Sequence, residues 1–450
     1  MILDKESLRV LNDAAARLEA GFGNLPAFEP FAPSEEVSSV LLRTAEKLQD
    51  NYPYFHPLYA GQMLKPPHPV ARLAYALAMF INPNNHALDG GRATSALEKE
   101  SVAEIAAMFG WQEFLGHLCG GGTMANLEAL WVAGQIAPGK PIVASEQAHY
   151  THKRISAVLQ LEFEAIPCDV RGKLDLNALE ARASKGDIGT VVATMGTTAT
   201  GSVDPLPEIL ELSRRYGFRV HADAAYGGYF ALASNLGAEA AAAFSKMREA
   251  DSIVIDPHKH GLQPYGCGCV LFRDPRAGQF YKHESPYTYF SSAELHLGEI
   301  SLECSRPGAA AAALWATQQL LPLQHGGQFA KGLERGREAA LELHKMLLTD
   351  ERFVPAFVPE LDIVIFVPNA EDRKIASSQS KAIFDAAARR DLHLALADLP
   401  AKFWQGTAVR FPTDDERVTC LRSVLMKPEH RDWLEPIWER LCAASDETCA

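Results

Sequence analysis

Five short segments of this chain carry residue types that can do chemistry, and each follows the end of a predicted strand. The first is CGGGTMANLEAL, residues 119–130. Its three glycines let backbone N–H groups approach an anion, and a helix that begins near Thr123 adds its positive dipole end and a hydroxyl group. A glycine turn between a strand and a helix is also common without a ligand. The segment therefore predicts a phosphate site only together with other signals.

Two further segments offer polar side chains directly after predicted strands. In EQAHYTHKR, residues 146–154, His149 lies where the site residues of open parallel sheets are found. In TMGTTATGSVDPL, residues 194–206, Thr198 offers a hydroxyl group within a loop of small residues. Taken alone, the histidine would more often cap a helix or lie in the core, and the second segment would be a simple turn.

An aspartate and a lysine follow the next two predicted strands. Asp223, in HADAAYGGYF, comes after apolar residues, so its carboxylate needs a partner such as a protonated pyridine nitrogen. Lys259, in SIVIDPHKHG, lies where a lysine can form a Schiff base. The alternatives are a helix-capping aspartate and a surface lysine. A metal site made of Asp256, His258 and His260 is disfavoured, because no other segment completes its ligand set.

Together the five segments meet the needs of one cofactor, pyridoxal phosphate. Its phosphate, pyridine nitrogen, aldehyde carbon and ring face each require a different side chain. All the candidates follow strand ends, where one crevice can collect them. We assign Gly122, Thr123 and His258 to the phosphate, Asp223 to the pyridine nitrogen, Lys259 to the aldehyde carbon and His149 to the ring face.

Short apolar runs predict the strands that must position these residues. They lie at 141–145, 190–195, 218–223, 252–256 and 269–273. Between them, helical segments are predicted at 124–136, 148–160 and 206–216. This alternation predicts an α/β fold with a mainly parallel sheet and helices on both faces.

The flanking regions are predicted to be helical. Ser95 and Glu98 fit a capping box for a helix that runs to about Phe109. A long helical segment from about 306 to 348 leads into a smaller α+β region. We expect an N-terminal helical segment at 1–50, a large cofactor-binding domain at 51–320 and a small C-terminal domain at 321–450.

Composition excludes several classes of protein. The chain has 450 residues and a formal net charge of -13, which disfavours a nucleic-acid or anionic-membrane partner. No apolar run approaches the roughly 20 residues of a spanning helix, and the first residues lack a signal-peptide core. The eight cysteines form no CxxC pair, so no zinc site is expected. We expect reduced thiols and a cytoplasmic location.

The ordered set GGGTMAN, EQAHY, GTTATGSVDPL, HADAAYGG and DPHK resembles the group II pyridoxal-phosphate-dependent amino acid decarboxylases, which include the aromatic-amino-acid and glutamate enzymes. The resemblance covers roughly residues 50–430. It implies the fold type I architecture, with a mainly parallel seven-stranded sheet and a smaller C-terminal α+β domain. It also implies a homodimer with active sites at the interface.

The resemblance further implies roles for single residues. Lys259 would be the Schiff-base lysine, Asp223 would form a salt bridge to the pyridine nitrogen, and His149 would stack on the ring. The other cofactor-lining positions are Gly122, Thr123, Thr198, Ala225, Asp256 and His258. The segment HPLYAGQM and the basic residue of ECSRPGAAAAALW supply candidate substrate residues, which are Tyr59, Gln62, Met63 and Arg306.

Two positions depart from the family pattern, which bears on the substrate and reaction outcome more than on the cofactor. Met124 stands where an acidic residue is usual, and Gly120 where a serine is common. The stretch from about 282 to 304 has no sustained helical or strand period, and the resemblance identifies it as the loop that closes over the substrate. Tyr287 and Tyr289 are its candidate proton donors, unless they only bury their rings in a surface connection.

The predicted reaction is α-decarboxylation of an L-amino acid to its amine and carbon dioxide, with an aromatic substrate preferred. Carbon–carbon lysis, oxidative deamination to an aldehyde, and transamination are alternative outcomes at the same cofactor. A catalytically silent cofactor-binding regulatory protein is a second alternative. A nicotinamide-dependent dehydrogenase ranks last, because the chain lacks a GxGxxG turn at its first strand.

Overall fold

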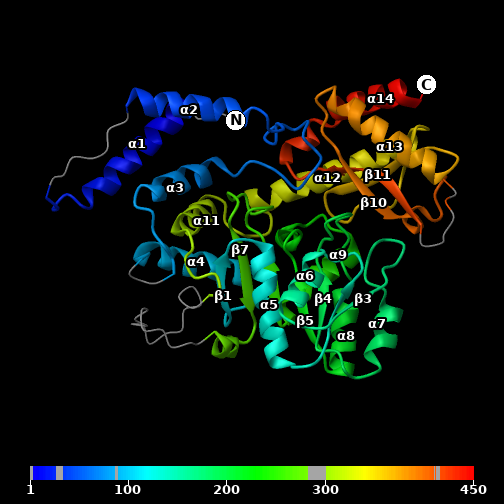
Figure 1. Ribbon diagram of the computed structural model, residues 1–450, viewed down its shortest axis with the longest axis horizontal. Helices are drawn as coiled ribbons and strands as arrows, with labels where there is room; N and C mark the ends of the chain where they lie inside the picture. Colours follow the sequence, from blue (N-terminus) through cyan, green and yellow to red (C-terminus); the bar gives the residue numbers. More distant parts are fainter. Residues whose placement is uncertain are drawn as a thin grey trace.

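The computed structural model describes residues 4–26, 34–86, 90–281, 301–409, 411 and 416–449. At its centre lies a seven-stranded sheet with the order β1-β7-β6-β5-β4-β2-β3 (Figure 1). Its strands are β1 (Leu115–Cys119), β2 (Ile142–Ser145), β3 (Phe163–Ile166), β4 (Thr190–Thr194), β5 (Arg219–Asp223), β6 (Ser252–Ile255) and β7 (Gly268–Phe272). Pairing is parallel from β3 to β6, whereas β7 runs antiparallel to β6 and β1.

The five apolar runs predicted to be strands form β2, β4, β5, β6 and β7, which confirms the predicted mainly parallel α/β sheet. Helices flank it, because strands that are buried on both faces need cover on both. The flanking helices are α5 (Gly122–Ile136), α6 (Thr151–Val158), α7 (Leu176–Ala183), α8 (Leu206–Tyr216) and α9 (Ala238–Ser245).

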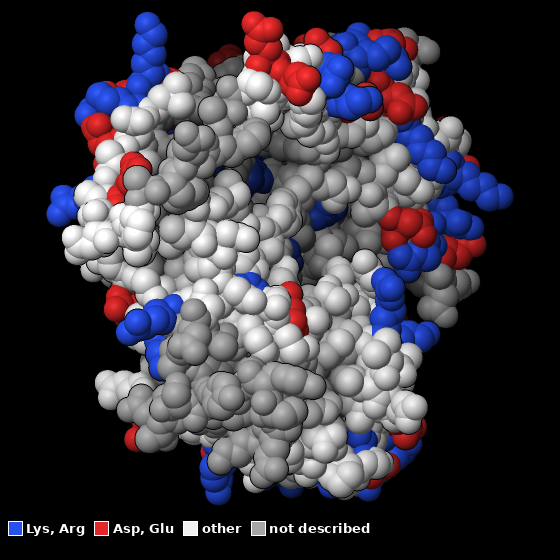
Figure 2. Space-filling model, turned by 60° about the vertical axis from the view of Figure 1, so that its left-hand side comes forward, with Lys and Arg blue, Asp and Glu red and all other residues white. Residues whose placement is uncertain are grey.

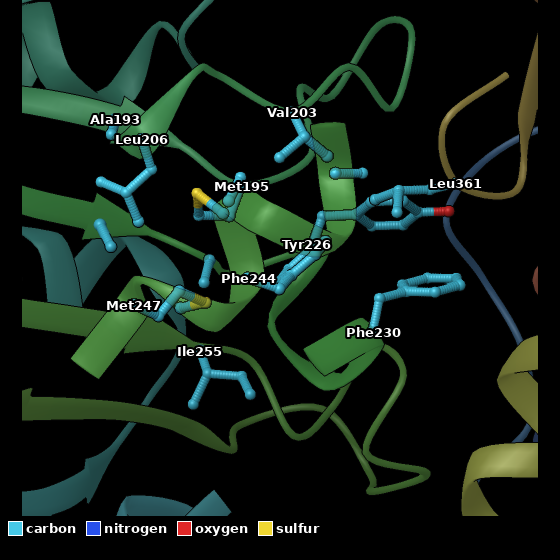
Figure 3. Close-up of a cluster of buried hydrophobic side chains, with 14 of the residues drawn as sticks. Ala193, Met195, Val203, Leu206, Tyr226, Phe230, Phe244, Met247, Ile255 and Leu361 are labelled. Atoms are coloured by element: carbon cyan, nitrogen blue, oxygen red, sulfur yellow. The ribbon is translucent and has the colours of Figure 1, made fainter. Parts of the chain in front are cut away.

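One hydrophobic core joins the sheet to its helices on one face. Figure 3 shows Met195 and Leu206 beside the end of β4, with Phe244 of α9 and Ile255 of β6 in the same cluster. Each of these side chains is buried. The ends of the strands are thereby fixed in a rigid frame from which the following loops project.

A second sheet is antiparallel and has the order β10-β11-β9-β8. Its strands are β8 (Phe353–Pro355), β9 (Ile363–Pro368), β10 (Ala395–Pro400) and β11 (Arg417–Val424). Helices α12 (Gln328–Thr349), α13 (Arg373–Ala388) and α14 (Leu434–Cys449) accompany it. In Figure 1 this orange sheet lies above the large one. Together with its helices it forms the smaller α+β region that the sequence predicts. The exact domain boundaries stay a prediction.

Two predictions about helices are wrong. The segment 306–348 is not one helix but two, α11 (Gly308–Leu320) and α12, because Pro322 and the positive φ of Gly326 interrupt it. The capping box is also wrong, since α4 (Arg92–Met108) starts before Ser95. Glu98 is buried inside α4, where its carboxylate accepts the Leu118 N–H at 3.0 Å.

The N-terminal region forms α1 (Lys5–Ala20) and α2 (Glu35–Leu48), followed by α3 (Pro69–Met79). Neither α1 nor α2 has a buried residue. Short 3-10 helices are η1 (Gly228–Leu232), η2 (Met247–Glu249), η3 (Pro275–Phe280), η4 (Ala401–Trp404) and η5 (Pro428–Arg431). No helix in the described ranges is long and apolar enough to cross a membrane.

Charge is unevenly placed on the surface. The face in Figure 2 is hollowed near its middle, and lysine or arginine atoms lie inside the hollow. Most acidic side chains in that view lie toward the outer edges. The positive groups of an acidic chain are thus found partly in its recesses.

Candidate active site

A cavity of about 510 Å³ lies at the carboxyl ends of the parallel strands. Its walls come from the segments that follow β1, β2, β4, β5 and β6. The structure therefore brings together every residue that the sequence predicted to contact the cofactor. These are Gly122, Thr123, His149, Thr198, Asp223, Ala225, Asp256, His258 and Lys259.

The glycine loop lies tightly against the Lys259 segment. Gly121 has a φ of +147°, and a Cβ there would lie 3.1 Å from His258 Cε1. A Cβ on Gly122 would lie 2.7 Å from Asp256 Oδ2. Helix α5 begins at Gly122 without a side-chain cap, so its first N–H groups remain available to an anion.

His258 has a fixed orientation beside this loop. Its Nδ1 lies 2.9 Å from the carbonyl oxygen of Cys267, which can only accept, so Nδ1 carries a proton. The other ring nitrogen, Nε2, lies 3.6 Å from Asp256 Oδ2. Burial lowers the pKa of His258, which favours a neutral imidazole where no anion is bound.

Asp223 at the end of β5 is held ionised by a second histidine. His152 Nε2 lies 2.8 Å from Asp223 Oδ2, and the Ala225 N–H donates to Asp223 Oδ1 at 3.2 Å. Burial opposes ionisation, but the hydrogen bond and charge of His152 outweigh it and keep the pKa of Asp223 well below its usual range. This carboxylate can stabilise a cation in the cavity.

Lys259 lies where its ammonium meets a buried acid. Its Nζ is 3.0 Å from Asp256 Oδ2. The other oxygen, Asp256 Oδ1, is buried and has no hydrogen-bond partner among the described residues.

His149 faces the same cavity, accepts the Thr151 N–H through Nδ1 at 3.3 Å, and has a pKa lowered chiefly by burial. A neutral ring is therefore available to cover a flat ligand.

These observations fit pyridoxal phosphate. The glycine loop offers unpaired N–H groups at one end of the cavity, and Asp223 offers a stable negative charge at the end of β5. Lys259 offers an amine, and the buried Asp256 Oδ1 leaves an acceptor unused. Among the described residues, no group of three or more His, Cys, Asp or Glu side chains could hold a metal ion.

A second cavity of about 370 Å³ adjoins the first, and the two share His149 and Thr198. Gln62 and Arg422 line it. Arg422 is 4% exposed and donates to Thr198 O at 2.7 Å and to Gln62 Oε1 at 3.3 Å. The described residues give this buried guanidinium only neutral acceptors, so a substrate carboxylate would find an uncompensated charge here.

The other predicted substrate residues do not line either cavity. Tyr59 is buried in a cluster of aromatic rings, and Met63 packs against the core. Arg306 is buried, and its Nη1 lies 2.7 Å from Glu98 Oε1, so it ties the start of α11 to α4. Tyr287 and Tyr289 lie outside the described residues.

Sequence reasoning missed two residues that matter most to the charge of the site. His152 follows His149 by three positions in a segment that was singled out, and that repeat was its signal. Arg422 lies in the buried part of β11, and a charge inside a buried strand must have a buried partner or a function.

Comparison with known proteins agrees with this geometry. The model of the pyridoxal-dependent decarboxylase conserved domain matches residues 124–368, more than half of the chain. A probable L-tyrosine/L-aspartate decarboxylase of Methanothermobacter thermautotrophicus is 30% identical over 68% of this chain and 82% of its own. An L-tyrosine decarboxylase of Enterococcus faecium is 26% identical over 83% of this chain and 82% of its own.

A crystal structure of Oryza sativa TDC with PLP and tryptamine superposes with a TM-score of 0.78 at 17% identity, and covers 99% of both chains. At this identity the likeness shows the fold, which is the fold type I architecture of pyridoxal-phosphate enzymes. The chain therefore belongs to the pyridoxal-dependent decarboxylase family, whose reaction is the pyridoxal-phosphate-dependent decarboxylation of amino acids.

Proposed function

We propose that Lys259 holds pyridoxal phosphate in the 510 Å³ cavity and that the chain there decarboxylates an L-amino acid. The observation that carries this proposal is the convergence of Lys259, Asp223 and the glycine loop on one cavity from three separate strand ends. The bound cofactor supplies a conjugated ring that takes up the electron pair of the broken Cα–carboxylate bond.

Each residue that contacts the cofactor has a defined task in this proposal. The N–H groups of Gly122 and Thr123, together with His258, bind the phosphate. Asp223 stays ionised and holds a proton on the pyridine nitrogen, which keeps the ring electron-withdrawing. His149 covers the ring and orients the substrate, so that the bond to be broken stands perpendicular to the ring.

The reaction outcome is tested by its products. Purified protein loaded with cofactor is incubated with each of the twenty amino acids, and carbon dioxide, amine, ammonia, aldehyde and keto acid are measured. We expect amine and carbon dioxide in equal amounts. Keto acid without carbon dioxide would indicate transamination, and aldehyde with ammonia would indicate oxidative deamination.

We infer that the preferred substrate is aromatic, which is supported by relatives named tyrosine decarboxylases. Arg422 supports a second candidate, an acidic amino acid whose side-chain carboxylate pairs with the guanidinium. Arg422→Leu separates the two. It should raise KM for aspartate far more than for tyrosine if the substrate is acidic.

The loop tyrosines remain part of the proposal. Phenylalanine substitution of Tyr287 or Tyr289 should leave cofactor and substrate binding intact, while amine formation falls if that phenol protonates Cα. If both variants form amine at the wild-type rate, the proton comes from elsewhere, with His149 the next candidate.

We also propose a homodimer with active sites at the interface, in the cytoplasm and with reduced thiols. Large apolar side chains stay exposed on the N-terminal helices, as a subunit interface requires: Val40, Leu41 and Leu48 of α2, and Phe80 after α3, are 49%, 63%, 62% and 70% exposed. Light scattering at assay concentration tests the dimer. An active monomer would contradict it.

A further inference from the structure

A third cavity, of about 450 Å³, lies close to the Lys259 segment. It is bounded by the Pro66–Pro67 turn, the first two turns of α12 and the start of η5. His260 and Leu262 form part of its wall, so it adjoins the loop that carries Lys259. None of its lining residues lines the 510 Å³ cavity.

Positive charge dominates this cavity, although the chain as a whole is acidic. Its charged and titratable lining side chains are Lys65, His68, His260, Lys331, Arg335, Lys427 and Glu429. Two of these are already paired: Arg335 lies 2.6 Å from Asp432, and His260 lies 2.7 Å from Asp362. Three lysines remain for a single carboxylate, that of the exposed Glu429.

The two inner lysines contact neutral groups rather than carboxylates, and the Lys427 ammonium also lies over the Tyr59 ring, 5.2 Å from its centroid. Lys427 is 3% exposed, and its Nζ donates to the Tyr59 carbonyl at 2.6 Å. Lys65 Nζ donates to the Met426 carbonyl at 3.3 Å. Among the described residues no carboxylate forms an ion pair with either lysine, and Asp362 and Glu429 attract Lys65 only from a longer distance. Burying an uncompensated charge is costly, and an anion would remove that cost.

The two ammonium groups also repel each other. Burial, with the charge of Lys65 adding to it, lowers the pKa of Lys427 to about 7. Burial lowers the pKa of Lys65 to about 8. A bound anion would hold both groups protonated, so its affinity must increase as the pH falls toward neutrality.

We propose that this cavity is a binding site for a small dianion, of the phosphate or dicarboxylate class, held between Lys65 and Lys427. The volume suits a small molecule rather than a protein segment. Two ammonium groups that line the same cavity match two negative oxygens, and the exposed Lys331 adds a third positive charge. The site is separate from the cofactor's phosphate loop.

Calorimetric titration of dialysed, cofactor-loaded protein with sulfate, inorganic phosphate and succinate tests the proposal. The cofactor phosphate then fills the glycine loop, so that loop cannot take up the probe. We expect saturable binding of at least one probe, with sulfate or phosphate binding indicating the phosphate class and succinate the dicarboxylate class. Sulfate does not titrate between pH 6 and 9, and its affinity should rise about tenfold or more as the pH falls across that range.

Variants assign any binding to this cavity. Lys427→Met and Lys65→Met should each weaken binding at least tenfold. Lys345→Met is the control, since Lys345 is an exposed lysine of α12 that does not line the cavity. If Lys427→Met unfolds, the half-buried Lys65 still provides the test. Absence of saturable heat with all three probes, or equal affinity in the Lys65 and Lys345 variants, would overturn the proposal.

Discussion

His152 Nε2 lies 2.8 Å from Asp223 Oδ2, and both side chains are almost fully shielded from solvent. One residue comes from the first turn of α6 and the other from the end of β5, so the pair joins the two segments that flank the cavity. The pair explains how a buried carboxylate remains negative. Its removal has consequences that depend on pH.

His152→Leu should shift the acidic limb of the activity profile to higher pH. The pKa of Asp223 in the folded protein lies below its unfolded value. The carboxylate therefore stays ionised as the pH falls through the unfolded pKa, and it is protonated only when the pH reaches the lower, folded pKa. Without His152, burial dominates and raises that pKa. Turnover measured from pH 4 to 8 should therefore decline at a higher pH than in the wild type, and superimposable profiles would show that the pair has no electrostatic role.

Asp223→Asn should leave the fold intact and cut turnover by about a hundredfold or more, because an amide cannot keep the pyridine nitrogen protonated. Circular dichroism checks the fold, and steady-state kinetics measure kcat. Wild-type turnover in this variant would mean that Asp223 only positions the Ala225 backbone.

Lys259→Ala should abolish the covalent link to the cofactor. Borohydride reduction followed by peptide mapping should label Lys259 in the wild type and no lysine in the variant. His258, Asp256 and the glycine loop still line the cavity in this variant, so weak non-covalent cofactor binding should persist. Labelling of a different lysine in the wild type would refute the assignment.

Gly122→Ala should weaken cofactor binding without unfolding the protein. The added Cβ would lie 2.7 Å from Asp256 Oδ2, so the acid or the loop must move. Gly237→Ala is a suitable control, because its φ is -66° and a Cβ there would meet nothing closer than 4.0 Å. Fluorescence titration with cofactor should show weaker binding only for Gly122→Ala, and equal affinities would show that the loop adapts.

Asp362→Ala should destabilise the protein by about 3–5 kcal/mol, the usual effect of removing one partner of a buried charged network. Its carboxylate accepts from Tyr226 at 2.5 Å and lies 2.7 Å from His260 Nε2, and all three side chains are buried. Urea unfolding monitored by fluorescence measures the change. Asp398→Ala, an exposed aspartate paired with Arg417 in β11, should change stability by less than about 1 kcal/mol.

The strands could be predicted because each central strand is a short apolar run bounded by turn residues. β3 was missed, since only Ile166 of its four residues is buried and no apolar run marks it. Pro322 and Gly326 mark the break between α11 and α12, but the helical spacing on either side of them favoured the prediction of one continuous helix. Ser95 and Glu98 matched a local motif, yet the tertiary partner Arg306 determines where Glu98 points.

The residues of the site also differ in whether a local sequence pattern could predict them. Residues that follow strand ends could be predicted, because the topology of a parallel sheet brings strand ends to one edge. Arg422 could not be placed, since it enters from the second sheet, and no local pattern reports which two sheets meet. The contact between Arg422 and Thr198 spans more than two hundred residues of chain.

The strand order of the large sheet has a consequence for biosynthesis. β1, which carries the glycine loop at its end, has β7 as its strand neighbour, and β7 lies far later in the chain. While the ribosome is still making the intervening residues, the backbone groups of β1 have no sheet to join and form an open edge. The wall of the cavity that is translated first can thus join the sheet only after Gly268–Phe272 has been made, since this strand lies between β1 and β6.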